Sequence, residues 1–175
     1  MMHHLYIRTT TRRKLDMTLR IIATGGTFDK HYDELEGKLG FDKSHLPQVI
    51  LRARMTLPVQ LEELPLLDSL DMNDADRQRI LGACLRADET GIVVVHGTDT
   101  MKQTAEVLGA AQLPKTIVLT GAMIPYETKN SDALFNFGFA CGIAQALPHG
   151  VYIAMNGRIF AWDKVRKNRS LGRFE

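Results

Sequence analysis

The chain has 175 residues, of which 45% are apolar and 24% charged, a composition typical of a globular protein with a core of its own. The net charge of +2 is small for a nucleic-acid-binding protein, which gathers basic side chains on one face, so we expect no nucleic-acid partner. No apolar run approaches the roughly 20 residues of a membrane span, so we expect no membrane contact and a cytoplasmic location.

Residues 1–16 are basic and rich in hydroxyl groups, and they lack the apolar region of a secretory signal. We predict a disordered extension over residues 1–16, followed by a single domain over 17–175. Cys84 and Cys141 lie far apart in segments with helical patterns, with no metal-ligand spacing around either. We expect both thiols to be buried, with no disulfide and no metal site.

Four short runs are apolar and rich in β-branched residues, and they lie at 19–23, 91–97, 116–122 and 150–155. None of them alternates apolar with polar residues. That pattern predicts strands buried on both faces of a parallel sheet.

Helical patterns separate these strands, at 75–87, 100–111 and 133–147, and Asn73 or Asp74 is placed to cap the first. The alternation of strand and helix predicts a single α/β domain. We expect its sheet to be doubly wound and mostly parallel, flavodoxin- or Rossmann-like, with helices flanking it. The apolar faces expected to pack on the sheet are Ile80, Leu81, Cys84 and Leu85; Ala105, Val107, Leu108 and Ala111; and Phe135, Phe139, Ile143 and Leu147.

In sheets of this kind ligands bind beyond the carboxyl ends of the strands, where strand order reverses. The segments at those positions are ATGGT, HGTDT, TGAMIP and MNGR, and the polar turn LDSLDMND precedes the first long helix. We interpret the polar residues 28–45 as a mobile loop or a hairpin over the strand ends. The sequence therefore predicts a site built from glycine- and threonine-bearing loops.

The TGGT segment ends in Thr27 and does not fit a phosphate-binding loop, because Asp29 follows where a phosphate needs amides or a lysine. A threonine hydroxyl is a poor nucleophile without a base. Thr98 stands beside Asp99, and lysines occur in the tail. A lysine held by Asp99 could take a threonine proton. From the residues alone TGGT could equally be a simple turn, Asp99 a helix cap, and His96 a satisfied core histidine.

The motifs TGGT, SLDMND, HGTDTM and TGAM, in this order from about Leu19 to Asn168, closely resemble the L-asparaginase/glutaminase family. The resemblance implies hydrolysis of L-asparagine to L-aspartate and ammonia without a cofactor. By it, Thr27 attacks the amide carbon and Tyr32 activates that threonine. The resemblance further implies a supporting set of Thr98, Asp99 and Lys167, and substrate contacts from Gly26, Ser69, Asp71, Gly97 and Ala122.

Two departures from the family pattern affect specificity and mechanism. Leu70 stands where the family has a glutamine, so we expect poor glutaminase activity. Aligning V-x-K selects Lys167 as the tail lysine, whereas an ungapped alignment places Arg166 there, and Lys164 lies nearby.

Members of the family are longer, with a second domain that completes a neighbouring subunit's site. The resemblance therefore implies a homo-oligomer, dimer or tetramer, here with a more open site and weaker substrate binding. Two alternatives remain: an amino-acid sensor with little turnover, and an amidotransferase subunit acting on an aminoacyl-RNA.

Overall fold

The computed structural model describes residues 18–175, so the expected extension at 1–16 lies outside the described residues. Within them the main sheet has six strands in the order β4-β1-β5-β6-β7-β8. All neighbouring pairs are parallel except β7 with β8. The strands are β1 (Leu19–Gly25), β4 (Val59–Leu67), β5 (Gly91–Val95), β6 (Thr116–Thr120), β7 (Gly150–Met155) and β8 (Arg158–Ala161). The predicted mostly parallel, doubly wound sheet is confirmed.

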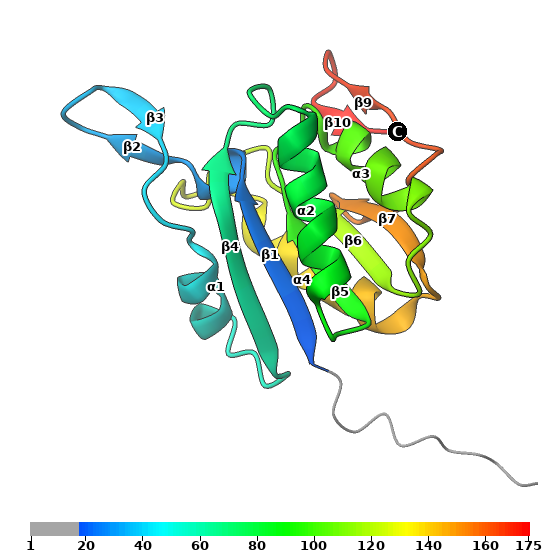
Figure 1. Ribbon diagram of the computed structural model, residues 1–175. Helices are drawn as coiled ribbons and strands as arrows, with labels where there is room; N and C mark the ends of the chain where they lie inside the picture. The colour runs from blue at the N-terminus through cyan, green and yellow to red at the C-terminus, as the bar shows by residue number, and fades with distance from the viewer. Residues whose placement is uncertain (1–17) are drawn as a thin grey trace, which may run out of the picture.

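Helices cover both faces of this sheet (Figure 1). The helices are α1 (Leu46–Arg52), α2 (Asp74–Arg86), α3 (Met101–Ala110) and α4 (Ala133–Ala146). Alternate strand residues point to opposite sides, so Ile22 and Val94 pack with α2 and α3, whereas Ile21 and Val95 pack with α1 and α4. The two cores hold the strands in register and so fix the positions of the loops at the strand ends.

Strand β4 is not among the strands that the sequence predicted. It lies at the edge of the sheet, and its sequence VQLEELPLL includes two glutamates and a proline. An edge strand tolerates proline because its outer N–H groups need no partner. Its half-buried pattern therefore differs from the fully buried runs of the central strands.

The predicted packing face of α4 is confirmed at Ile143, which is buried, and at Phe139 and Leu147, which pack against the core, but it is wrong at Phe135, which is 61% exposed. Phe137, Ala140 and Ala144 face the core as well. Leu85 of α2, also predicted to pack inward, is 57% exposed. Helix α4 is apolar on nearly all sides, so periodicity could not select its buried face, and its small alanines allow a close approach to the sheet.

Other local predictions are confirmed. Asn73 caps α2, with its Oδ1 accepting from the amide of Ala75 at 2.8 Å. Cys84 and Cys141 are buried free thiols, and burial raises the pKa of each to about 12. Among residues 18–175 no helix is both long and apolar enough to cross a membrane.

Two small antiparallel pairs flank the carboxyl ends of the parallel strands (Figure 1). The first is the β2–β3 hairpin, made of β2 (His31–Asp33) and β3 (Lys38–Gly40), which projects from the body beyond β1. The second is made of β9 (Lys167–Asn168) and β10 (Arg173–Phe174), close to the C-terminus. The site therefore has a hairpin on one side and the folded tail on the other.

Candidate active site

The turns after β1 and β5 touch each other at two glycines. A Cβ on Gly26 would lie 2.3 Å from the Cα of Gly97, and Gly26 has a φ of +72°. A Cβ on Gly97 would in turn lie 2.6 Å from Ser69 Oγ. Only glycine permits this approach and this backbone conformation. The loops after β1, β4 and β5 therefore meet where strand order reverses, the position at which α/β sheets bind ligands.

Thr27 begins a single 3₁₀ turn, Thr27–Asp29, directly after Gly26. Its side chain is partly exposed, and its hydroxyl makes no hydrogen bond to any residue within 18–175. Phe28 and Asp29, next in the turn, are fully buried. The turn is thus anchored by its two buried residues, while Thr27 stays partly exposed beside them.

Asp29 joins the turn to the segment that follows the hairpin. Its Oδ1 accepts hydrogen bonds from Ser44 Oγ at 3.0 Å and from the His45 amide at 2.9 Å. Burial raises the pKa of Asp29, although these two donors favour its ionised form. The β2–β3 hairpin is therefore closed at its base.

Tyr32 lies on β2 of this hairpin and is 64% exposed. Within the described part of the chain it makes no hydrogen bond to another predicted site residue. Residues 28–45 thus include a hairpin, one of the two forms expected from the sequence.

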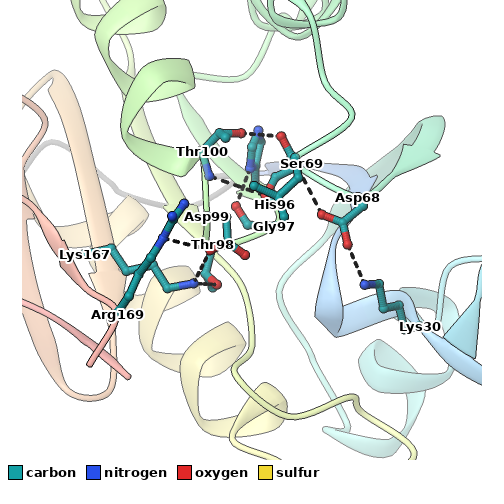
Figure 2. Close-up of polar contacts among 11 residues, drawn as sticks. Lys30, Asp68, Ser69, His96, Gly97, Thr98, Asp99, Thr100, Lys167 and Arg169 are labelled. Atoms are coloured by element: carbon teal, nitrogen blue, oxygen red, sulfur yellow. Dashed lines mark hydrogen bonds and ion pairs between the residues drawn. The ribbon is translucent and has the colours of Figure 1, made fainter. Parts of the chain in front are cut away.

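The supporting set is assembled in the structure. Lys167 Nζ lies 2.8 Å from Thr98 Oγ1 and 2.9 Å from Asp99 Oδ1, as Figure 2 shows. The Lys167 side chain is 13% exposed, and Thr98 is buried. Arg169 Nε, which the sequence did not suggest, lies 3.6 Å from Asp99 Oδ1. The interpretation of Asp99 as the helix cap is wrong, because Thr100 occupies the N-cap of α3.

Packing of the tail explains why Lys167, among the basic residues considered, reaches Thr98. Val165 and Phe174 are buried in the core shared with α2 and α3. Arg166 instead turns outward to Glu175, with 2.6 Å between its Nη2 and Oε1, and Lys164 is exposed. Backbone hydrogen bonds between Arg166 and Glu175 extend the pairing of β9 with β10 by one residue, so the adjacent side chains of Arg166 and Lys167 point to opposite sides.

His96 supports the loop from beneath. Its Nδ1 is 2.7 Å from the Gly97 carbonyl oxygen, and its Nε2 is 2.8 Å from Thr104 Oγ1. Because a carbonyl can only accept, Nδ1 carries the proton and Thr104 donates to Nε2. Burial lowers the pKa of His96 to about 4, so the ring is neutral at pH 7. This is the satisfied core histidine expected from the sequence.

Ser69 is buried and is joined to the start of α3, since the Thr100 hydroxyl donates to the Ser69 carbonyl oxygen at 2.6 Å. Ala122 is buried just beyond β6. Asp71 is exposed, and within the described chain its carboxylate makes no hydrogen bond. The structure therefore brings Gly26, Ser69, Gly97, Thr98, Asp99 and Lys167 together, while within the described residues the side chains of Tyr32 and Asp71 make no hydrogen bond to this cluster.

An ion pair that sequence analysis missed lies beside Ser69. Lys30 Nζ donates to Asp68 Oδ2 at 2.5 Å, linking the turn that contains Thr27 to the loop after β4 (Figure 2). Burial of Asp68 opposes its ionisation. Even so, its pKa is below the usual value because of the hydrogen bond from Lys30, the Leu70 amide and the charges of Lys30 and Lys167. The two residues come from separate loops, so only the fold reveals their contact.

The family described as "Asparaginase, N-terminal" matches residues 18–173. The chain belongs to the asparaginase family. L-asparaginase of Thermococcus kodakarensis is 32% identical over 161 residues, which are 89% of this chain and 49% of that protein. L-asparaginase 1 of Escherichia coli K12 is 30% identical over 166 residues, 89% of this chain and 48% of that protein. The chain spans about half the length of these relatives.

A solved structure of the thermostable T. kodakarensis L-asparaginase superposes with a TM-score of 0.81 at 30% identity, covering 91% of this chain and 51% of that one. Another similar protein carries a different name. It is a glutamyl-tRNA(Gln) amidotransferase subunit from Aeropyrum pernix, which is 33% identical over 146 residues, 78% of this chain and 34% of that protein. Fold and sequence thus agree on the family, and its members carry the names of different amide-processing enzymes.

Proposed function

We propose that this protein hydrolyses L-asparagine to L-aspartate and ammonia through a threonine ester. The observation that carries the proposal is the contact of Lys167 with both Thr98 and Asp99, beside the turn that presents Thr27. Family membership supports the same reaction. The 175-residue chain would perform it without a metal or another cofactor.

In the first half-reaction the Thr27 oxygen attacks the side-chain amide carbon. The proton of its hydroxyl passes to the leaving nitrogen, which departs as ammonia and leaves an aspartyl ester on Thr27. Tyr32, brought in by the hairpin, would receive that proton from Thr27 and pass it on to the leaving nitrogen. Backbone N–H groups at the joined turns of Gly26 and Gly97 would stabilise the oxyanion.

In the second half-reaction water cleaves the ester. Thr98 holds the water, and Lys167, when neutral, accepts a proton through the Thr98 hydroxyl. Asp99 would orient the lysine. The positive charge of Arg169, which also faces Asp99, offsets part of the negative charge beside the lysine. The water oxygen joins the aspartyl carbon, the ester bond to Thr27 breaks, and the proton taken up by Lys167 passes to the Thr27 oxygen. The α-carboxylate and α-amino groups of the substrate would be bound by Ser69 and Asp71. Gly97 and Ala122 would also contact the substrate.

The experiment that tests this proposal measures ammonia release from L-asparagine by the wild-type chain and by Thr27→Ala and Thr98→Ala. Thr56→Ala is the matched control, because Thr56 is exposed and lies at the opposite end of β4 from the site. We expect both site variants to lose turnover and the control to keep it. Full activity in Thr27→Ala would refute the proposal.

L-glutamine provides the specificity test. Leu70 offers no polar group where the family has a glutamine, so we expect much slower ammonia release from L-glutamine than from L-asparagine. Equal turnover of the two amides by the wild-type chain would contradict this.

The similarity to an amidotransferase favours a second candidate, an amide hydrolase that supplies ammonia for modification of an aminoacyl-RNA. RNA binding with a steep salt dependence would distinguish it. We further propose a cytoplasmic homo-oligomer. Light scattering tests the assembly, and fractionation tests the location.

A further inference from the structure

The loop after β6 packs against two segments of the candidate site. A Cβ on Gly121 would lie 2.3 Å from the carbonyl oxygen of His96, which is two residues before Thr98. On the other side of the loop, Met123 Cε lies 3.9 Å from the position of a Cβ on Gly172, in the turn between β9 and β10. The loop therefore packs between the segment of Thr98 and this tail turn.

The carboxylate of Asp132 fixes this loop. Asp132 Oδ1 accepts hydrogen bonds from the backbone N–H groups of Met123 at 3.0 Å and of Ile124 at 3.1 Å. Its Oδ2 accepts from the side-chain amides of Asn136 at 2.9 Å and Asn156 at 3.1 Å. All of these partners are N–H donors, and in the described part of the chain the carboxylate forms no ion pair. This position therefore needs a group that only accepts, which an ionised carboxylate provides.

Asn136 extends the network and is fully buried. Its Nδ2 also donates to the Gly121 carbonyl oxygen at 3.0 Å, and its Oδ1 accepts from the backbone N–H of Asn156 at 2.9 Å. Asn156 lies in the turn between β7 and β8. Both the nitrogen and the oxygen of the Asn136 amide thus have partners, and a satisfied buried network of this kind makes the loop rigid.

We propose that Asp132 is a positioning residue for the step in which water cleaves the ester. With the loop fixed by Asp132, Met123 supports the tail turn that follows Lys167, and Gly121 supports the segment of Thr98. The contact of 2.8 Å between Lys167 Nζ and Thr98 Oγ1 is thereby held at the distance that proton transfer needs. This inference rests on the proposed function and adds the residue that positions its supporting set.

Two variants disturb this support at different points. Asp132→Asn keeps the shape of the side chain but turns an N–H group toward other N–H donors. Met123→Ala keeps the backbone N–H and removes the contact with the tail turn. Asp88→Asn and Met55→Ala are the matched controls. Asp88 is exposed and Met55 is partly buried, and they precede the amino ends of β5 and β4, at the opposite end of the sheet from the site.

We expect both variants to slow only the second half-reaction. In a reaction that passes through an ester, slower cleavage of the ester lowers kcat and KM together and leaves kcat/KM unchanged. With L-asparagine, kcat should fall by about 10- to 100-fold while kcat/KM stays within about twofold of wild type. The controls should keep both parameters. A fall of kcat/KM in step with kcat, or an unchanged kcat in either variant, would overturn the inference. Met123→Ala decides alone if Asp132→Asn does not fold.

A second measurement does not depend on turnover. Acetylation of Lys167 by acetic anhydride, followed by peptide mass spectrometry, reports how firmly its amine is held, because the side chain is 13% exposed. We expect this acetylation to be about 3- to 10-fold faster in both variants than in wild type, with exposed Lys164 unchanged as the internal control. If the wild-type chain releases no ammonia, the hydrolase proposal is refuted and acetylation alone decides the positioning role. Faster acetylation of Lys167 in the variants would keep that role, and equal acetylation would overturn it.

Discussion

The two sides of the candidate site differ in how firmly the fold holds them. On one side Thr98, Asp99 and Lys167 are in hydrogen-bond contact, and the lysine is 13% exposed. On the other side Thr27 has no side-chain partner within the described residues, and Tyr32 is 64% exposed on a projecting hairpin. The side that we propose to activate water is thus pre-assembled, whereas the side that we propose to attack the amide depends on the position of the hairpin.

Removing the amine of Lys167 should have the largest effect. In Lys167→Met the base of the assembled side is lost, so we expect kcat to fall by about 100- to 10,000-fold. Lys164→Met is the control, because that lysine is exposed and outside the cluster. Lys167→Arg should not restore activity, since arginine stays protonated. Retained activity in Lys167→Met would show that the contact is only structural.

Loosening the tail tests why the assembled side is rigid. Phe174 is 3% exposed and fixes β10 against the core beside β9. We expect Phe174→Ala to lower the free energy of unfolding by about 3 kcal/mol in urea titration, and kcat to fall because Lys167 loses its support. If Phe174→Ala keeps a normal kcat, the tail does not position the lysine.

On the hairpin side, a substitution should lower kcat without lowering the stability of the fold. Tyr32→Phe removes only an exposed hydroxyl, so we expect the free energy of unfolding to stay within about 0.5 kcal/mol of wild type. In steady-state assays kcat should fall by about 10- to 100-fold, because the proton of Thr27 loses its acceptor. A normal kcat would assign Tyr32 no part in the reaction.

The smallest effect is expected at the base of the hairpin. Because burial raises the pKa of Asp29 in the folded state, the folded protein holds that proton to higher pH than the unfolded chain does. Its contribution to stability is therefore largest at acid pH and declines as pH rises through the folded pKa. Asp29→Asn removes this decline. Urea midpoints between pH 4 and pH 7 should fall further in wild type than in the variant, and parallel profiles would contradict the assignment.

The sequence predicted the parts of the molecule with strong local patterns. Central strands such as 91–97 could be predicted because strands buried on both faces are apolar throughout. Edge strand β4 was not predicted, since its exposed positions include Glu63 and Pro65.

In the candidate site, motifs predicted Thr27 and Thr98. No local pattern could choose between Arg166 and Lys167, because that choice depends on how Phe174 folds the tail back. The Lys30–Asp68 pair depends in the same way on two loops meeting.

The central claim is that the open side makes the ester and the assembled side resolves it. The most direct test quenches the 175-residue chain with acid during turnover of L-asparagine and locates the aspartyl group by peptide mass spectrometry. Our account predicts an ester on the peptide that contains Thr27, at a higher steady-state level in Thr98→Ala than in wild type. An ester on Thr98, or turnover by Thr27→Ala, would contradict it.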